Sequence, residues 1–112
     1  MATSSHLASE TLWITGTGVA GATATVAALG AGMRCYVRCV GLQILAGTAT
    51  LASVELRDSA TARLGWTFPT TGGVVEFSKP IPITSPNTAF NAVATTTGAT
   101  TTNIYVGYCV GP

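Results

Sequence analysis

The sequence predicts an all-β protein, a single antiparallel β-sandwich of jelly-roll-like form with about eight short strands. Apolar residues alternate with polar ones over short runs, as Leu64, Trp66 and Phe68 do, which is typical of a half-buried strand. Glycine, proline, threonine and asparagine separate these runs and favour turns. No segment combines helix propensity with a helical apolar period without glycine interruptions.

The stretch 54–84 organises the chain, because it contains three predicted strands and the turns between them. Near the end of this stretch, Pro80 and Pro82 remove backbone donors at alternate positions, which confines their segment to a sheet edge or an extended crossing. We expect the core of the sandwich to include Leu56, Leu64, Trp66, Phe68 and Phe77.

Five further strands are predicted outside this stretch, four of them short. The first, at 11–15, ends at the glycines that follow it, and residues 22–28 form the next. Another strand is predicted at 89–95. The last strand places Ile104, Val106 and Tyr108 on one face and Tyr105, Gly107 and Cys109 on the other.

The longest strand-like run is 33–45, and strict alternation places Val37 and Cys39 on one face. Both faces are largely apolar, so this strand is central or meets another subunit. Gly41 in its middle predicts a bulge or a close backbone approach. We therefore expect a subunit interface formed by Trp13, Tyr36, Arg38, Val40 and Leu42.

The composition indicates one domain that is covered by partners. The 112 residues suffice for one core, which we place at 10–112, while the small polar residues 1–9 form a flexible N-terminal arm. Only 8% of residues are charged, against roughly 25% in an average soluble domain. The net charge of +1 does not favour nucleic acid or anionic lipid, and no apolar run approaches the roughly 20 residues of a membrane helix.

Three cysteines cannot form a complete disulfide framework, and we expect Cys35, Cys39 and Cys109 to be reduced and unreactive. His6 is the only histidine, so neither a metal site nor a cofactor is expected. The sequence has no secretory signal pattern, which predicts synthesis in a reducing cytoplasm.

Two groups of residues have a chemical interpretation as well as a purely structural one. Glu55 and Glu76 would form a glycosidase-like carboxylate pair if neighbouring strands juxtaposed them, but solvated pairs with Arg57 and Lys79 explain them more simply. We expect no enzymatic activity. Core and interface packing likewise explains the aromatic residues better than the alternative, a sugar-stacking platform formed by Trp13, Trp66, Tyr36, Tyr105 and Tyr108.

Four segments carry a resemblance over the last two thirds of the chain: ELRDSATARLGWTFP, GGVVEFSKPIPI, TAFNAVATTT and TTNIYVGYC. This pattern of core positions resembles small jelly-roll decoration (cement) proteins of tailed-bacteriophage capsids. The resemblance implies a non-enzymatic structural protein of the virion, made in the host cytoplasm, which binds the outer capsid surface and stabilises the shell. It implies the major capsid protein as partner, and self-association as a homotrimer or another symmetric homo-oligomer.

A binding module of the phage tail is the alternative to a capsid protein. Similar patterns occur in small domains of tail fibres and baseplates, so the alternative is a carbohydrate- or receptor-binding head domain. That function would favour exposed aromatic residues on loop tips, and the loops at 70–73 and 97–100 carry none.

Overall fold

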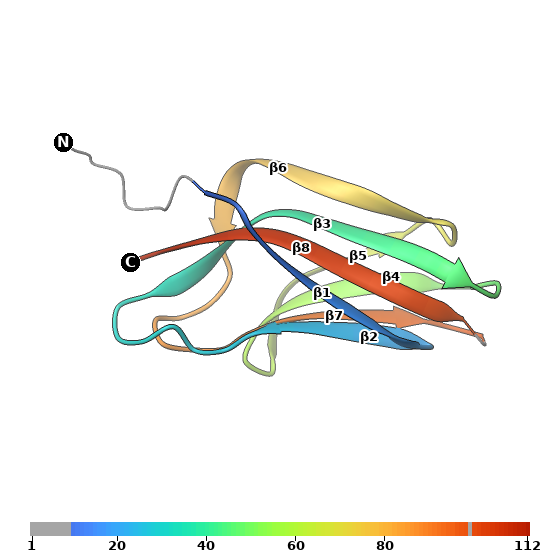
Figure 1. Ribbon diagram of the computed structural model, residues 1–112, viewed down its shortest axis with the longest axis horizontal. Coiled ribbons are helices and arrows are strands. Elements are labelled where there is room, and N and C mark those ends of the chain that lie inside the picture. Colours follow the sequence, from blue (N-terminus) through green and yellow to red (C-terminus); the bar gives the residue numbers. More distant parts are fainter. Residues whose placement is uncertain (1–9, 99) are drawn as a thin grey trace.

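Eight β-strands make up the computed structural model of the chain, which describes residues 10–98 and 100–112 (Figure 1). The expected arm at 1–9 lies outside the described residues. In this part of the chain no helix is long and apolar enough to cross a membrane. The strands are β1 (Leu12–Val19), β2 (Gly21–Val26), β3 (Arg34–Ala46), β4 (Ala52–Asp58), β5 (Thr61–Phe68), β6 (Gly72–Pro82), β7 (Phe90–Thr96) and β8 (Thr101–Gly111).

The strands form two four-stranded antiparallel sheets, in the orders β1-β8-β3-β6 and β2-β7-β4-β5. Every connection except β4–β5 passes from one sheet to the other. Eight strands that alternate in this way form the double Greek key of a jelly roll. The predicted fold class is confirmed.

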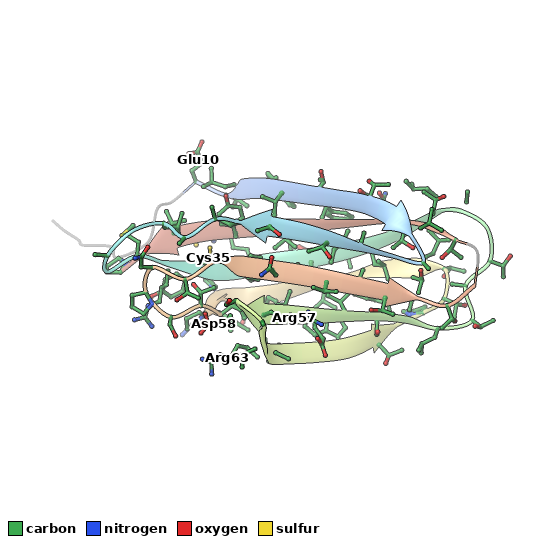
Figure 2. The ribbon with its side chains drawn as sticks, turned by 90° about the horizontal axis from the view of Figure 1, so that it is seen from below. Glu10, Cys35, Arg57, Asp58 and Arg63 are labelled. Carbon is green, nitrogen blue, oxygen red and sulfur yellow. The ribbon has the colours of Figure 1, made fainter. Side chains whose placement is uncertain are left out.

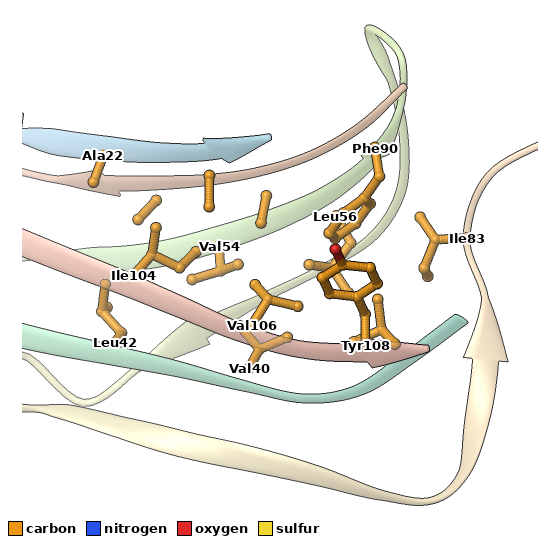
Figure 3. Close-up of a cluster of buried hydrophobic side chains, with 14 of the residues drawn as sticks. Ala22, Val40, Leu42, Val54, Leu56, Ile83, Phe90, Ile104, Val106 and Tyr108 are labelled. Carbon is orange, nitrogen blue, oxygen red and sulfur yellow. The ribbon is translucent and has the colours of Figure 1, made fainter. Parts of the chain in front are cut away.

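The core lies between the sheets and follows the period-two pattern of each strand. In β4, for example, Val54 and Leu56 are buried while the residues between them are partly exposed. Both belong to one buried cluster with Ile104 and Val106 of β8, which point inward from the opposite sheet (Figure 3). The largest fully buried side chain is that of Phe90.

The predicted core from 54–84 is only partly correct. Leu56 and Phe68 are buried, whereas Leu64, Trp66 and Phe77 are partly buried and pack against the border of the core. The reason is topological, because β5 and β6 are the edge strands of two different sheets. Trp66 makes edge-to-face contacts within and between these two edge strands. Its ring centroid lies 6.0 Å from that of Phe68 on β5 and 6.2 Å from that of Phe77 on β6.

A β-bulge interrupts the alternation of β3. Val37 pairs with Tyr108 and Cys39 pairs with Gly107, so Arg38 is the extra residue of the bulge. The extra residue shifts the phase of the strand by one position. The prediction that Val37 and Cys39 share a face is therefore wrong, since Val37 points into the core and Cys39 points outward.

Edge strand β6 contains both prolines, as their lost donors predicted. It pairs with β3 in two short sections, 72–76 and 81–82, and Pro80 lies in the unpaired section between them. Because this section of β6 does not pair with β3, the missing N–H of Pro80 removes no hydrogen bond from the sheet.

Strand β1 is longer than predicted, because it continues through Gly16 and Gly18 to Val19. These glycines lie at core-facing positions where β1 crosses close to β2. An added Cβ at Gly16 would clash with the carbonyl oxygen of Thr23, and one at Gly18 would clash with that of Gly21. The glycines therefore allow the two sheets to approach each other along this side.

We expect Gly16→Ala to lower the free energy of unfolding by about 1–3 kcal/mol, because the clash is with rigid backbone. Gly65→Ala is the matched control, since its Cβ would lie at ordinary contact distance, 3.4 Å from the oxygen of Val54. That variant should be neutral or slightly stabilising. Urea unfolding of both variants measures the difference, and equal stability of the two would contradict the close approach of β1 and β2.

Candidate functional site

The outer surface of the β1-β8-β3-β6 sheet carries the most unusual group of side chains in the described part of the molecule. Trp13 is 58% exposed there, although tryptophan is usually well covered. We call the surface around it the aromatic face and define it by five residues, none of them charged: Trp13, Cys39, Gly41, Tyr105 and Gly107.

Trp13 lies across the neighbouring strand rather than standing away from the sheet. Its partner position on β8 is Gly107, and an added Cβ there would come within 3.0 Å of the indole ring. The same Cβ would come within 2.8 Å of the sulfur of Cys39 on β3. The missing side chain of Gly107 thus leaves room for the indole and the thiol to meet above β8.

Tyr105 repeats this arrangement one strand further. Its partner position on β3 is Gly41, and an added Cβ there would clash with the phenol ring. The sequence predicted a bulge or a close backbone approach at Gly41; the bulge lies at Arg38 instead, and the group that approaches Gly41 is an aromatic ring. The ring centroids of Trp13 and Tyr105 lie 6.4 Å apart with an interplanar angle of 43°. Two glycines therefore allow two rings to rest against the sheet as one apolar platform.

A row of polar side chains lies beside the platform. Thr17 Oγ1 donates to Asn103 Oδ1 at 3.0 Å, and Asn103 Nδ2 donates to Gln43 Oε1 at 3.0 Å. We call these three residues the amide row. An amide can donate two hydrogen bonds and accept two, so the row keeps donors and acceptors for a ligand or a partner. The site combines apolar rings with neutral polar groups.

The predicted interface residues separate into two groups. Trp13 is exposed, Tyr36 and Arg38 are half-buried, and the Tyr36 hydroxyl donates to the carbonyl oxygen of Pro112 at 2.6 Å. Val40 and Leu42, by contrast, are 0% and 2% exposed and lie between the sheets (Figure 3). Their assignment to an outer interface is wrong, because the bulge at Arg38 turns them into the core.

The candidate sugar-stacking platform is assembled only in part. Trp13 and Tyr105 come together, while Tyr108 is buried and Trp66 packs on the other side of the sandwich. Sequence analysis did not identify the glycines beneath the rings as part of the site. The signal that could have revealed them is the pairing of an aromatic residue with a glycine across neighbouring strands.

The candidate carboxylate pair is not formed. Glu55 lies on the outward side of β4, and Glu76 lies on the outward side of β6 in the opposite sheet. Glu55 instead forms an ion pair with Arg57, with 2.6 Å between Oε1 and the guanidinium nitrogen. Over the described residues no group of three or more potential metal-ligating side chains occurs.

All three cysteines are free thiols. Burial raises the pKa of Cys35 to about 11, with a smaller contribution from Cys109. Burial also raises the pKa of Cys39; a backbone hydrogen bond at Gly107 opposes this change, and the nearby Glu76 carboxylate adds to it. A raised pKa lowers the thiolate fraction, so each effect disfavours reaction.

The chain matches no protein-family model and no curated protein. Among solved structures it shows a weak similarity to the CBM22-1 and GH10 modules of endo-1,4-β-D-xylanase 10B from Clostridium thermocellum, complexed with xylohexaose. The identity is 16% and the TM-score is 0.24, over 88% of this chain and 26% of that one. This chain thus spans about a quarter of that protein's length, and a similarity of this degree carries no argument about function.

We expect thiol labelling of the native protein to be slow at all three cysteines and to be fastest at Cys39, which is half-buried beside Trp13. Trp13→Ala should raise the labelling rate of Cys39 several-fold, because the indole and the sulfur both lie over Gly107 and removal of the ring opens the approach to the thiol. Cys35 and Cys109 are internal controls and should label only in denaturant. Peptide mass spectrometry reports each site, and equally fast labelling of Cys35 and Cys39 would contradict this arrangement.

Proposed function

We propose that this chain is a non-enzymatic structural protein of a phage virion, which binds the outer surface of the capsid as a decoration protein and stabilises the shell. The major capsid protein is its partner, and a homotrimer or another symmetric homo-oligomer is its form on the particle. The observation that carries this proposal is the aromatic face, whose five residues carry no charge and include a tryptophan that is 58% exposed; Glu76 of β6 borders it, at the partner position of Cys39.

Physical properties of the aromatic face support attachment to another protein. Contiguous apolar patches exposed on a protein surface often mark interaction sites, and here two aromatic rings lie together on one sheet. Interface centres are enriched in tryptophan and tyrosine and depleted of charge, as this face is. Trp13 and Tyr105 rest against backbone, so little side-chain freedom is lost when a partner covers them. We choose the major capsid protein as the partner because the last two thirds of the sequence resemble capsid decoration proteins.

A second candidate is a carbohydrate- or receptor-binding head domain of a tail fibre or baseplate. The amide row beside the two rings favours it, because sugars present an apolar face to aromatic rings and hydroxyl groups to amides. Both candidates use the same surface, so one set of variants separates them.

We expect Trp13→Ala to weaken attachment to capsids prepared without this protein by about thirtyfold, corresponding to about 2 kcal/mol for a central interface tryptophan. Attachment should change little between about 0.1 M and 1 M salt, because apolar burial is not screened. Co-sedimentation of protein with capsids measures both effects. The matched control is Leu51→Ala, which removes an exposed apolar side chain outside the aromatic face and should bind as the wild type does.

Three outcomes would argue against capsid attachment through this face. Equal binding of the Trp13 and Leu51 variants would assign the contact to another surface. Release of the protein by high salt would assign it to charged groups. Failure to bind capsids, together with retention on immobilised polysaccharide that Trp13→Ala abolishes, would favour the second candidate.

A further inference from the structure

A pocket lies at the end of the sandwich where β3 begins, away from the aromatic face. It is lined by Arg34 of β3, Arg63 of β5, Pro82 at the end of β6 and residues 83–86 that follow it. Strands of both sheets therefore contribute to it. The function proposed above makes no use of this pocket.

Hydrogen bonds hold the wall formed by 82–86 in place. The backbone nitrogen of Ile83 donates to the carbonyl oxygen of Cys35 at 3.1 Å, and the nitrogen of Cys35 donates to Thr84 Oγ1 at 2.9 Å. Ser85 Oγ donates to Asp58 Oδ2 at 2.8 Å, at the end of β4. The wall is thus tied to β3 and to the β4–β5 turn, and a ligand would meet a preformed surface.

One of the two guanidinium groups already has a partner. Arg63 donates to Asp58 Oδ2 at 2.9 Å, and this bond holds the pKa of the buried Asp58 carboxyl below its usual value (Figure 2). The Arg63 side chain remains 51% exposed. A guanidinium has five N–H donors, so most of those on Arg63 are available to a ligand.

Arg34 has no such partner. Among residues 10–98 and 100–112 it forms no ion pair and no side-chain hydrogen bond, although it is half-buried and its Nε is shielded from solvent. Burying a charged donor without an acceptor is unfavourable, and buried charges are ordinarily paired. The two arginines and Asp58 leave a local charge of +1. The Nε of Arg34 is thus a donor without an acceptor in a pocket of net positive charge.

We propose that this pocket binds an oxyanion, the carboxylate or phosphate group of a ligand or of a partner, between Arg34 and Arg63. Both groups offer oxygen pairs that match the planar donor fork of arginine. One such anion would pair Arg34 and neutralise the local charge. The proposal is independent of the capsid assignment, because it rests on Arg34 and not on the aromatic face.

The test is a titration of the wild-type protein followed by NMR of the arginine side chains. The chain has four arginines, at 34, 38, 57 and 63, so their Nε–H signals can be followed individually. Inorganic phosphate and malonate are the two probes, each added against chloride at constant ionic strength. We expect a saturable shift of the Arg34 and Arg63 signals, and no saturable shift of Arg57, which is paired with Glu55 outside the pocket.

Variants assign the binding to these residues. Arg34→Gln should weaken the probe affinity about tenfold or more, while Arg57→Gln, the matched control, should leave it unchanged. Saturation with phosphate alone would identify a phosphoryl ligand, and saturation with malonate would identify an acidic side chain or a free carboxylate. Small linear shifts shared by all four arginines, or equal affinity of the Arg34 and Arg57 variants, would overturn the proposal. The wild-type titration decides the question even if Arg34→Gln fails to fold.

Discussion

Both faces of the β1-β8-β3-β6 sheet depend on the β-bulge at Arg38. One extra residue in β3 sets which side chains reach the core, so Val37, Val40 and Leu42 all pack inward despite their mixed spacing. The same shift turns Cys39 and Gly41 outward. Without the bulge, Leu42 would face solvent and Gly41 would leave a void in the core, because a one-residue slip exchanges the two faces of a strand.

The outward turn of Gly41 also makes the aromatic face flat. Tyr105 can rest against β3 only because its partner position there has no side chain, and Trp13 rests against β8 above Gly107 for the same reason. Glycine normally weakens the interior of a strand, because it loses more conformational entropy on folding than other residues and has no side chain to pack. Here the rings cover the backbone that the glycines expose. A surface of this kind combines low charge with a large, preformed contact area.

The sequence predicted the fold class and the eight strands well, because alternation and turn residues are local signals. It placed the proline segment at an edge correctly, since a missing donor has the same effect in any topology. It misplaced Val40 and Leu42, because a bulge adds one residue without any local signature at Arg38. It overestimated the burial of Trp66 and Phe77, whose cover depends on which strands become sheet edges. The aromatic pair depends on registers between distant strands, which no single segment encodes.

Hydroxyl-radical footprinting of the intact protein tests whether a capsid covers the aromatic face, as we propose. Free protein should be modified readily at Trp13, which is exposed, and also at Leu51, which lies outside the face. When the protein is bound to capsids, we expect strong protection of Trp13 and Tyr105 and an unchanged modification rate of Leu51. Modification of Trp13 at the same rate in free and capsid-bound protein would contradict it.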